Sequence, residues 1–283
     1  MASYRDMGFE GDELGVLSAL TVGYKETLDR ELSDAYATAG AAHVLAISGL
    51  HTGFLYALFL FLFVPVWHRW RWLKLPLMAL ILLLLWGFAL FTGLSTSVVR
   101  AAAMCSLSLL SLLQYHRPFT LNLLAAAAFG MLFFRPLWLF DVGFQLSFFA
   151  VAGIVWLQPK LAALWQPRLL PMRWLWSLVT LSIAAEAATL PLTLHYFSRF
   201  PTYFLLTNLW VIPMVTLVLY GGVLLWAMTP FPALLHPLAA LLKGLIQWQN
   251  ALLGRIAALP YAAIEGVHWR AMEVLLCYLA LFL

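Results

Sequence analysis

Residues 75–93 decide the fold class of this 283-residue chain, because they read LPLMALILLLLWGFALFTG and contain no charged side chain. A transmembrane helix needs about 20 predominantly apolar residues, since the hydrocarbon core of a bilayer is about 30 Å thick. The whole chain has this character: 64% of its residues are hydrophobic, only 10% are charged, and the mean hydropathy is +0.92. An ordinary soluble domain is about half apolar and about a quarter charged. The composition therefore predicts an integral membrane protein.

Comparable apolar runs recur along the chain and predict an all-α, polytopic helical bundle of about seven to nine transmembrane or re-entrant helices. The runs lie near residues 44–66, 75–93, 97–114, 120–134, 142–158, 174–195, 202–228, 233–252 and 270–283. The 120–134 run is short for a span. The 202–228 run contains Pro213, Gly221 and Gly222, so it is either kinked or a re-entrant pair that lines a cavity.

The first 42 residues differ from the rest and predict an acidic, amphipathic segment (1–42) before a transmembrane domain (43–283). Residues 1–34 carry three basic and eight acidic side chains, whereas residues 35–283 carry 13 basic and four acidic ones. Residues 11–42 look like a polar or interfacial helix. The basic membrane part is compatible with three roles, which are setting the topology, attracting anionic lipid and passing a polyanion.

The positions of Lys and Arg in the short loops predict the orientation of the chain. Basic residues cluster before the second run, after the third, and between the fifth and sixth, and these are Arg69, Arg71, Lys74, Arg117, Lys160, Arg168 and Arg173. All of these loops fall on one side if each earlier run crosses once. We expect that side to be the cytoplasm, which places the N-terminal segment outside the cytoplasmic membrane.

Polar side chains inside the apolar runs are the candidate functional residues, because a charge near the bilayer centre must face a partner or water. At 100° per residue, His43, Ser48 and His51 lie on one polar half of a helix. In the third run, Ser97 and Arg100 begin a narrow polar stripe that continues toward the end of the run.

Two acidic residues stand at or within later runs. Asp141 precedes Gln145 by one turn at the start of the fifth run, where it could cap the helix. Glu186 lies inside the sixth run and is a candidate partner of Arg100. Interhelical hydrogen bonding alone also explains polar stripes of this kind.

Three motifs in this order carry a resemblance to a known family: HVLAISGLH at 43–51, GLSTSVVRA at 93–101 and GFQLSF at 143–148. The segment NLWVIP at 208–213 fits as well. The chain resembles the membrane domain of the ComEC competence family from about residue 11 to at least residue 208. The resemblance implies a cytoplasmic-membrane channel that admits one strand of transforming DNA during natural competence.

A single DNA strand carries one negative charge per nucleotide, so its path needs water, hydrogen-bond donors and modest positive charge. Asp141 and Glu186 fit such a path only if they are buried charge partners of Arg100 or face away from the strand. The candidate residues along the path are His43, Ser48, His51, Ser97, Arg100, Gln145, Ser147 and Asn208.

Enzymatic activity is not expected in this chain. It contains neither an HxHxD metal motif nor a Walker-type GxxxxGK[ST], and the spacing of His43 and His51 does not match a helical zinc pair. We therefore expect no metal and no cofactor. Members of the ComEC family commonly carry an OB-fold domain and a metallo-β-lactamase-like domain, and neither lies within residues 1–283. Because the chain ends inside an apolar run, we expect a piece of a longer protein or a member whose other domains are separate chains.

The expected partners are single-stranded DNA, membrane lipid, a DNA receptor outside, a separate nuclease and a cytoplasmic motor, and homo-oligomerisation stays open. Two alternative functions also stay open. One is a proton- or cation-coupled small-solute transporter that uses Glu186 and Asp141. The other is an intramembrane serine hydrolase with Ser48 as nucleophile and His51 or His195 as base.

Overall fold

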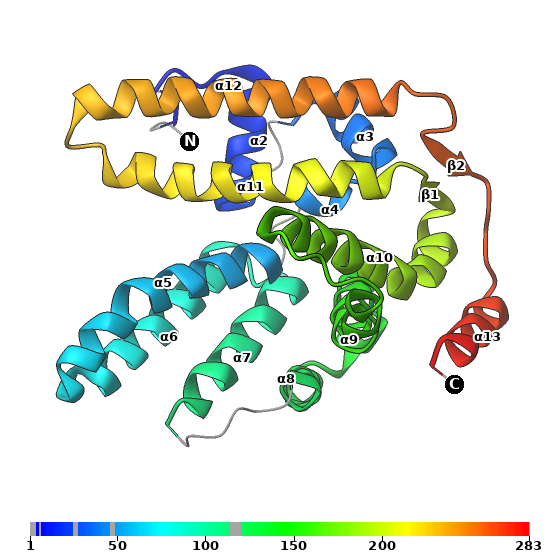
Figure 1. The fold of residues 1–283 in the computed structure, drawn as a ribbon, viewed down its shortest axis with the longest axis horizontal. Coiled ribbons are helices and arrows are strands. Elements are labelled where there is room, and N and C mark those ends of the chain that lie inside the picture. Colours follow the sequence, from blue (N-terminus) through cyan, green and yellow to red (C-terminus); the bar gives the residue numbers. More distant parts are fainter. Residues whose placement is uncertain (1–3, 6, 25–27, 46–48, 114–119, 283) are drawn as a thin grey trace. The chain divides into compact units, whose positions relative to one another are not determined.

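The computed structural model describes the chain except residues 1–3, 6, 25–27, 46–48, 114–119 and 283 (Figure 1). Its regular structure is almost entirely helical, which confirms the predicted all-α class. The chain divides into two compact units. The first comprises Met1–Ala46 and Trp156–Leu283, and the second comprises Ile47–Val155.

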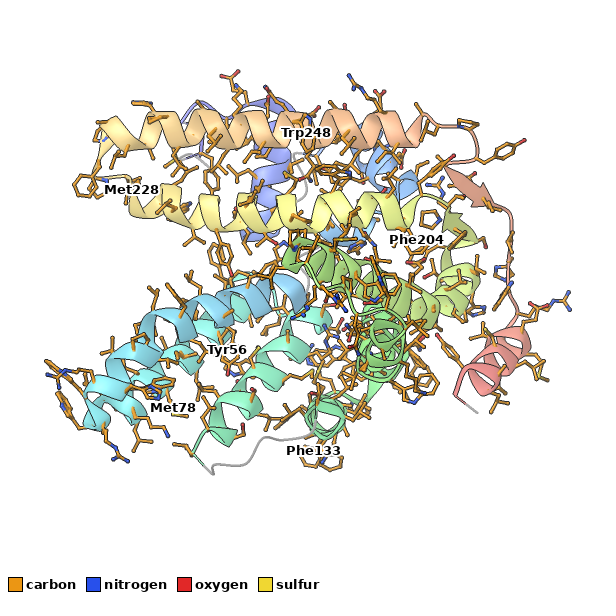
Figure 2. All side chains as sticks on the ribbon, in the orientation of Figure 1. Tyr56, Met78, Phe133, Phe204, Met228 and Trp248 are labelled. Atoms are coloured by element: carbon orange, nitrogen blue, oxygen red, sulfur yellow. The ribbon has the colours of Figure 1, made fainter. Side chains whose placement is uncertain are left out.

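The second unit is built mainly from apolar helices. Its elements are α5 (Gly49–Arg69), η1 (Arg71–Leu73), α6 (Lys74–Phe91), α7 (Thr96–Ser111), α8 (Thr120–Phe134), η2 (Pro136–Phe140) and the first part of α9 (Val142–Ala163). Helices α5, α6 and α7 pack side by side around Ile81, Leu85 and Leu109, none of which is exposed. In contrast, Phe133 on α8 is 72% exposed and points away from the ribbon in Figure 2, as a lipid-facing side chain would.

The first unit combines the N-terminal helices with the last part of the chain. Its elements are α2 (Gly11–Val22), α3 (Arg30–Thr38), α4 (Ala42–Leu45), the end of α9, α10 (Leu170–Phe197), β1 (Arg199–Pro201), α11 (Phe204–Ala227), α12 (Pro232–Ala257), β2 (Ala263–Glu265) and α13 (Ala271–Phe282). Helices α11 and α12 form a long antiparallel hairpin, and α2 crosses it (Figure 1). Strands β1 and β2 pair in antiparallel register, with Phe200 opposite Ile264.

Five described helices are long and apolar enough to cross a membrane: His51–Arg69, Arg71–Phe91, Val142–Ala163, Leu170–Phe197 and Phe204–Trp226. Three shorter apolar helices are Thr96–Ser111, Thr120–Phe134 and Ala271–Ala280. The predicted run at 202–228 forms one continuous helix that passes through Pro213, and not a re-entrant pair. The run at 233–252 lies within α12, which is not among the five, because polar side chains such as Lys243 and Gln247 interrupt its apolar sequence.

The N-terminal stretch 11–42 is divided among three helices and does not form the single helix that the sequence suggested. Helix α2 ends at Gly23, whose φ of 76° lies in the left-handed region that glycine tolerates. Leu17 and Leu20 of α2 are fully buried in the core of the first unit. Helix α2 packs against α11 near Gly222, where a Cβ atom would lie only 2.8 Å from Cγ2 of Thr21. Close helix packing therefore explains why α2 is buried.

Candidate functional site

Arg100 lies on α7 in the second unit and is only 7% exposed. Its Nη1 donates a hydrogen bond to the carbonyl oxygen of Ser147 on α9. Its Cζ atom is 5.9 Å from the centroid of the Phe148 ring, a distance at which a cation and an aromatic ring attract each other. A buried charge is costly unless it is compensated, so these contacts with α9 hold the guanidinium group in place.

Gly49, the first residue of α5, allows a second close approach to the same guanidinium group. A Cβ atom at this position would collide with Nη2 of Arg100 and would lie 3.4 Å from Cβ of Ala101. By contrast, a Cβ atom on Gly53 in the same helix would meet no atom within 4 Å. Sequence reasoning did not single out Gly49, although its presence in the first motif was the available signal.

Several buried polar atoms in this region have no hydrogen-bond partner within the described residues. They are Nε of Arg100, Oγ of Ser147 and Oγ1 of Thr52. Thr52 follows Gly49 by three residues and therefore lies on a similar face of α5. We call Gly49, Thr52, Arg100 and Ser147 the Arg100 cluster. Buried polar groups in proteins almost always bond to protein or to water, so these three atoms retain hydrogen-bonding capacity.

Asp141, the acid of the second unit, is exposed and does not pair with Arg100 in the described structure. Its Oδ1 accepts hydrogen bonds from the backbone N–H of Phe144 at 2.7 Å and from the hydroxyl of Thr96 at 3.0 Å. The carboxylate thus caps the start of α9 and ties it to the start of α7. Of the roles that the sequence left open for Asp141, these hydrogen bonds fit the helix cap and not the buried charge partner.

Two other predicted residues of the second unit lie on the same two helices. Ser97 is half-buried on α7. Gln145 is half-buried on α9, and its Nε2 donates to the carbonyl oxygen of Leu139 at 2.9 Å. This bond holds the turn before α9. Hydrogen bonds between α7 and the start of α9 therefore bring motif residues 93–101 and 143–148 together.

The remaining predicted residues are divided between the two units. Ser48 lies outside the described residues, and His51 is buried on α5 with 1% exposure. His43 is exposed on α4 of the first unit. Asn208 on α11 is 8% exposed, and its Oδ1 has no partner within the described residues.

Glu186 is half-buried within α10 of the first unit, one of the five span-length helices. Its backbone carbonyl lies 3.4 Å from the hydroxyl of Thr189 and accepts a hydrogen bond from it. The predicted pairing of Glu186 with Arg100 stays a prediction. Within the described residues, no group of three or more His, Cys, Asp or Glu side chains is placed to hold a metal ion.

A second buried polar network, which sequence reasoning missed, lies in the first unit. The hydroxyl of Tyr36 on α3 donates to Oδ1 of Asn250 at 2.7 Å and accepts from Nε2 of Gln249 at 3.0 Å. Burial raises the pKa of Tyr36 well above its ordinary value of 10.0. We call Tyr36, Gln249 and Asn250 the Tyr36 network. It fixes α3 to α12.

The helices and the buried polar cluster define a polytopic α-helical membrane protein. A family model described as "Competence protein" matches residues 20–283, so the chain belongs to the competence protein family. This confirms the resemblance that the three motifs indicated.

The chain is also similar to individual curated proteins. The chain is 30% identical over 267 residues to "ComE operon protein 3" of Bacillus subtilis (strain 168), an alignment that covers 91% of this chain and 32% of that protein. It is 31% identical over 131 residues to an "Uncharacterized protein" of Aquifex aeolicus (strain VF5), with 46% of this chain and 30% of that protein covered. The chain thus spans about a third of the length of these curated relatives. No solved structure matches the chain.

Proposed function

We propose that this chain forms a membrane channel that admits single-stranded transforming DNA during natural competence. Membership of the competence family and five span-length helices support this proposal. The observation that carries it is the buried guanidinium group of Arg100, which has no carboxylate partner in its own unit and retains an unpartnered donor. A buried cation with spare hydrogen-bonding capacity suits the passage of phosphate groups.

The Arg100 cluster also suits transit better than tight binding. One guanidinium nitrogen already bonds to the carbonyl oxygen of Ser147, so only part of the donor capacity is available to a phosphate. Conduction requires sites that attract an ion without retaining it. Such contacts reach the backbone of the strand and no base edge, so import should be independent of DNA sequence.

The proposed location is the cytoplasmic membrane, with the N-terminal segment outside. The described loop cations support this orientation: η1 and its flanks carry Arg69, Arg71 and Lys74, and the connection after α9 carries Arg168. In this proposal the chain itself catalyses no reaction. A DNA receptor outside, a nuclease and a cytoplasmic motor would be separate proteins or separate domains.

The direct test is complementation of competent cells whose own channel is deleted. Cells that carry this chain should accumulate labelled transforming DNA in the cytosol, whereas cells with an empty vector should not. The membrane level of the chain is measured in parallel by immunoblotting. A normal membrane level with no cytosolic DNA would contradict the proposal that this chain is sufficient for import.

A further inference from the structure

A cavity of about 290 Å³ lies in the first unit, where the connection after α9 leads into α10. Its lining combines one cation, one amide and one hydroxyl with aromatic and small apolar groups: Ala162, Trp165, Gln166, Pro167, Arg173, Trp176 and Ser177. The two tryptophan rings pack edge to face with centroids 5.4 Å apart. This cavity plays no part in the proposed DNA path.

The walls of the cavity are held in place by the protein itself. Nε1 of Trp176 donates to the carbonyl oxygen of Ala162 at 3.3 Å, which links α10 to the end of α9. Pro167 is buried beside them. This hydrogen bond and the ring contact hold Trp165 and Trp176 together. Arg173, in contrast, is exposed and forms no ion pair with a described acidic residue. Its guanidinium group is available to a ligand.

The stretch of sequence that contains the cavity lining carries charge of one sign only. Residues 142–185 contain no acidic side chain, and their three charged residues are Lys160, Arg168 and Arg173. Lys160 lies on the last turn of α9, with its Nζ 3.5 Å from the centroid of the Trp156 ring. Among the residues that line the cavity, Arg173 is the charged one, so the lining attracts an anionic ligand.

Exposed apolar residues lie between the lining residues in the sequence, and we call them the apolar rim. Leu164 is 76% exposed, Leu170 is 74% exposed and Trp174 is 56% exposed. Helices α9 and α10 both have the length and apolarity of membrane spans, so their adjoining ends belong at the membrane interface. A ligand at this place meets both polar and aromatic groups in the cavity and exposed apolar side chains beside them in the sequence, so an amphipathic ligand suits it.

We infer that this cavity binds the headgroup of an anionic glycerophospholipid from the surrounding membrane. The phosphodiester would pair with Arg173, the headgroup hydroxyls would bond to Gln166 and Ser177, and the acyl chains would run along the exposed apolar rim. Basic pockets between transmembrane helices are known to suit anionic headgroups. A nucleic acid strand also carries phosphate and has bases that stack on tryptophan rings, but it has no acyl chain to cover the apolar rim, and the competition experiment separates the two.

The test is native mass spectrometry of the full 283-residue chain in detergent with added phosphatidylglycerol or phosphatidylcholine. We expect the chain to retain about fivefold more phosphatidylglycerol, since one cation at a membrane surface contributes a preference of this size. The Arg173→Gln variant should lose this preference, and Arg173→Lys should keep most of it. Arg135→Gln is the matched control, because Arg135 is also exposed and lies 5.4 Å from the ring of Trp138, but it lines no described cavity.

Competitors distinguish a lipid from other phosphate sources. Neither free glycerol 3-phosphate nor a single-stranded oligonucleotide should displace bound phosphatidylglycerol. Equal retention of the two lipids, or an unchanged preference in Arg173→Gln, would overturn the inference. Displacement by glycerol 3-phosphate would identify a soluble-phosphate site instead, and displacement by the oligonucleotide would identify a nucleic acid site. Thermal unfolding of each variant verifies that it is folded, and binding is measured without any DNA uptake.

Discussion

The Arg100 cluster and the Tyr36 network are both buried and polar, but they differ in how many of their polar atoms have a described hydrogen-bond partner. In the Tyr36 network, the hydroxyl group donates to Asn250 and accepts from Gln249, and only Oε1 of Gln249 lacks a described partner. In the Arg100 cluster, a charged side chain and two hydroxyl groups each retain an unpartnered atom. Partnered groups stabilise a fold, whereas unpartnered ones remain available to water or substrate. We therefore propose a structural role for the Tyr36 network and a transport role for the Arg100 cluster.

The largest expected effect is that of Arg100→Ala, which removes the only cation of the cluster. Cytosolic arrival of labelled DNA should fall by about tenfold or more, because phosphate groups would lose the positive charge that the cluster supplies along their proposed path. Arg135→Ala is the control, since Arg135 is exposed. DNA uptake by cells that carry Arg135→Ala should stay near that of cells with the unmodified chain when the membrane amounts of the two proteins are matched.

Arg100→Lys sharpens this experiment. Lysine keeps the charge but cannot donate in two directions from a planar group. Uptake should therefore lie between that of the unmodified chain and that of Arg100→Ala. Normal uptake in Arg100→Ala at a normal membrane level would show that the guanidinium group only braces α7 against α9.

A smaller loss is expected from Gly49→Ala, because its Cβ atom would collide with the guanidinium group. Because the contacted Nη2 atom is the end of a flexible side chain, we expect the added Cβ atom to displace the guanidinium group from Ser147 and not to disrupt the helices. Uptake should fall several-fold, while Gly53→Ala in the same helix should have little effect, since its Cβ atom meets no neighbour. Equal uptake in the two variants would show that α5 and α7 do not need this close approach.

Tyr36→Phe should affect stability and leave transport intact. Removal of the hydroxyl leaves Asn250 and Gln249 without their shared partner, so the free energy of unfolding should fall by about 1–3 kcal/mol. Denaturant unfolding in detergent measures this change. Tyr261→Phe is the control, because Tyr261 is 84% exposed. Uptake per folded molecule should be unchanged, and a specific loss of uptake would remove the contrast between the two regions.

Alkaline pH probes the same tyrosine. Burial raises the pKa of Tyr36, so the folded state favours the neutral hydroxyl. The resulting stabilisation is present below the ordinary tyrosine pKa of about 10 and is lost as the pH rises above it. The fall in unfolding free energy above that pH should be smaller in Tyr36→Phe. An identical fall in both proteins would show that Tyr36 ionises freely.

The smallest expected effect is that of Ser48→Ala. A channel would lose one hydroxyl group, so uptake should change by less than about twofold. The variant also tests the alternative in which Ser48 is a nucleophile. Abolition of a measurable peptide-cleaving activity by this substitution would support the hydrolase and oppose our proposal that the chain is not an enzyme.

The sequence predicted the features that depend on local pattern. Apolar runs predicted the helices. The position of Arg100 in the polar stripe of the third run predicted that its charge would face a partner or water. The family followed from three motifs. Each of these inferences rests on residues that are close together in the chain, where helix periodicity fixes their relative directions.

Features that depend on distant contacts could not be predicted. Tyr36 and Asn250 are 214 positions apart, so nothing in either segment indicates their hydrogen bond. The burial of α2 and the close approach at Gly49 likewise depend on which helices pack together. The role of Asp141 was ambiguous because a carboxylate before a helix either caps it or pairs with a cation, and only the position of Phe144 N–H decides.

Water access to the Arg100 cluster tests the central claim most directly. Thr52→Cys would be prepared in a chain whose Cys105 and Cys277 are replaced by serine, and treated in membranes with a small charged thiol reagent. Leu85→Cys is the control, because Leu85 is fully buried in apolar surroundings. We predict that Thr52→Cys reacts, that Leu85→Cys does not, and that DNA in transit protects Thr52→Cys. A folded Thr52→Cys chain that imports DNA but is as inert as Leu85→Cys would contradict the account.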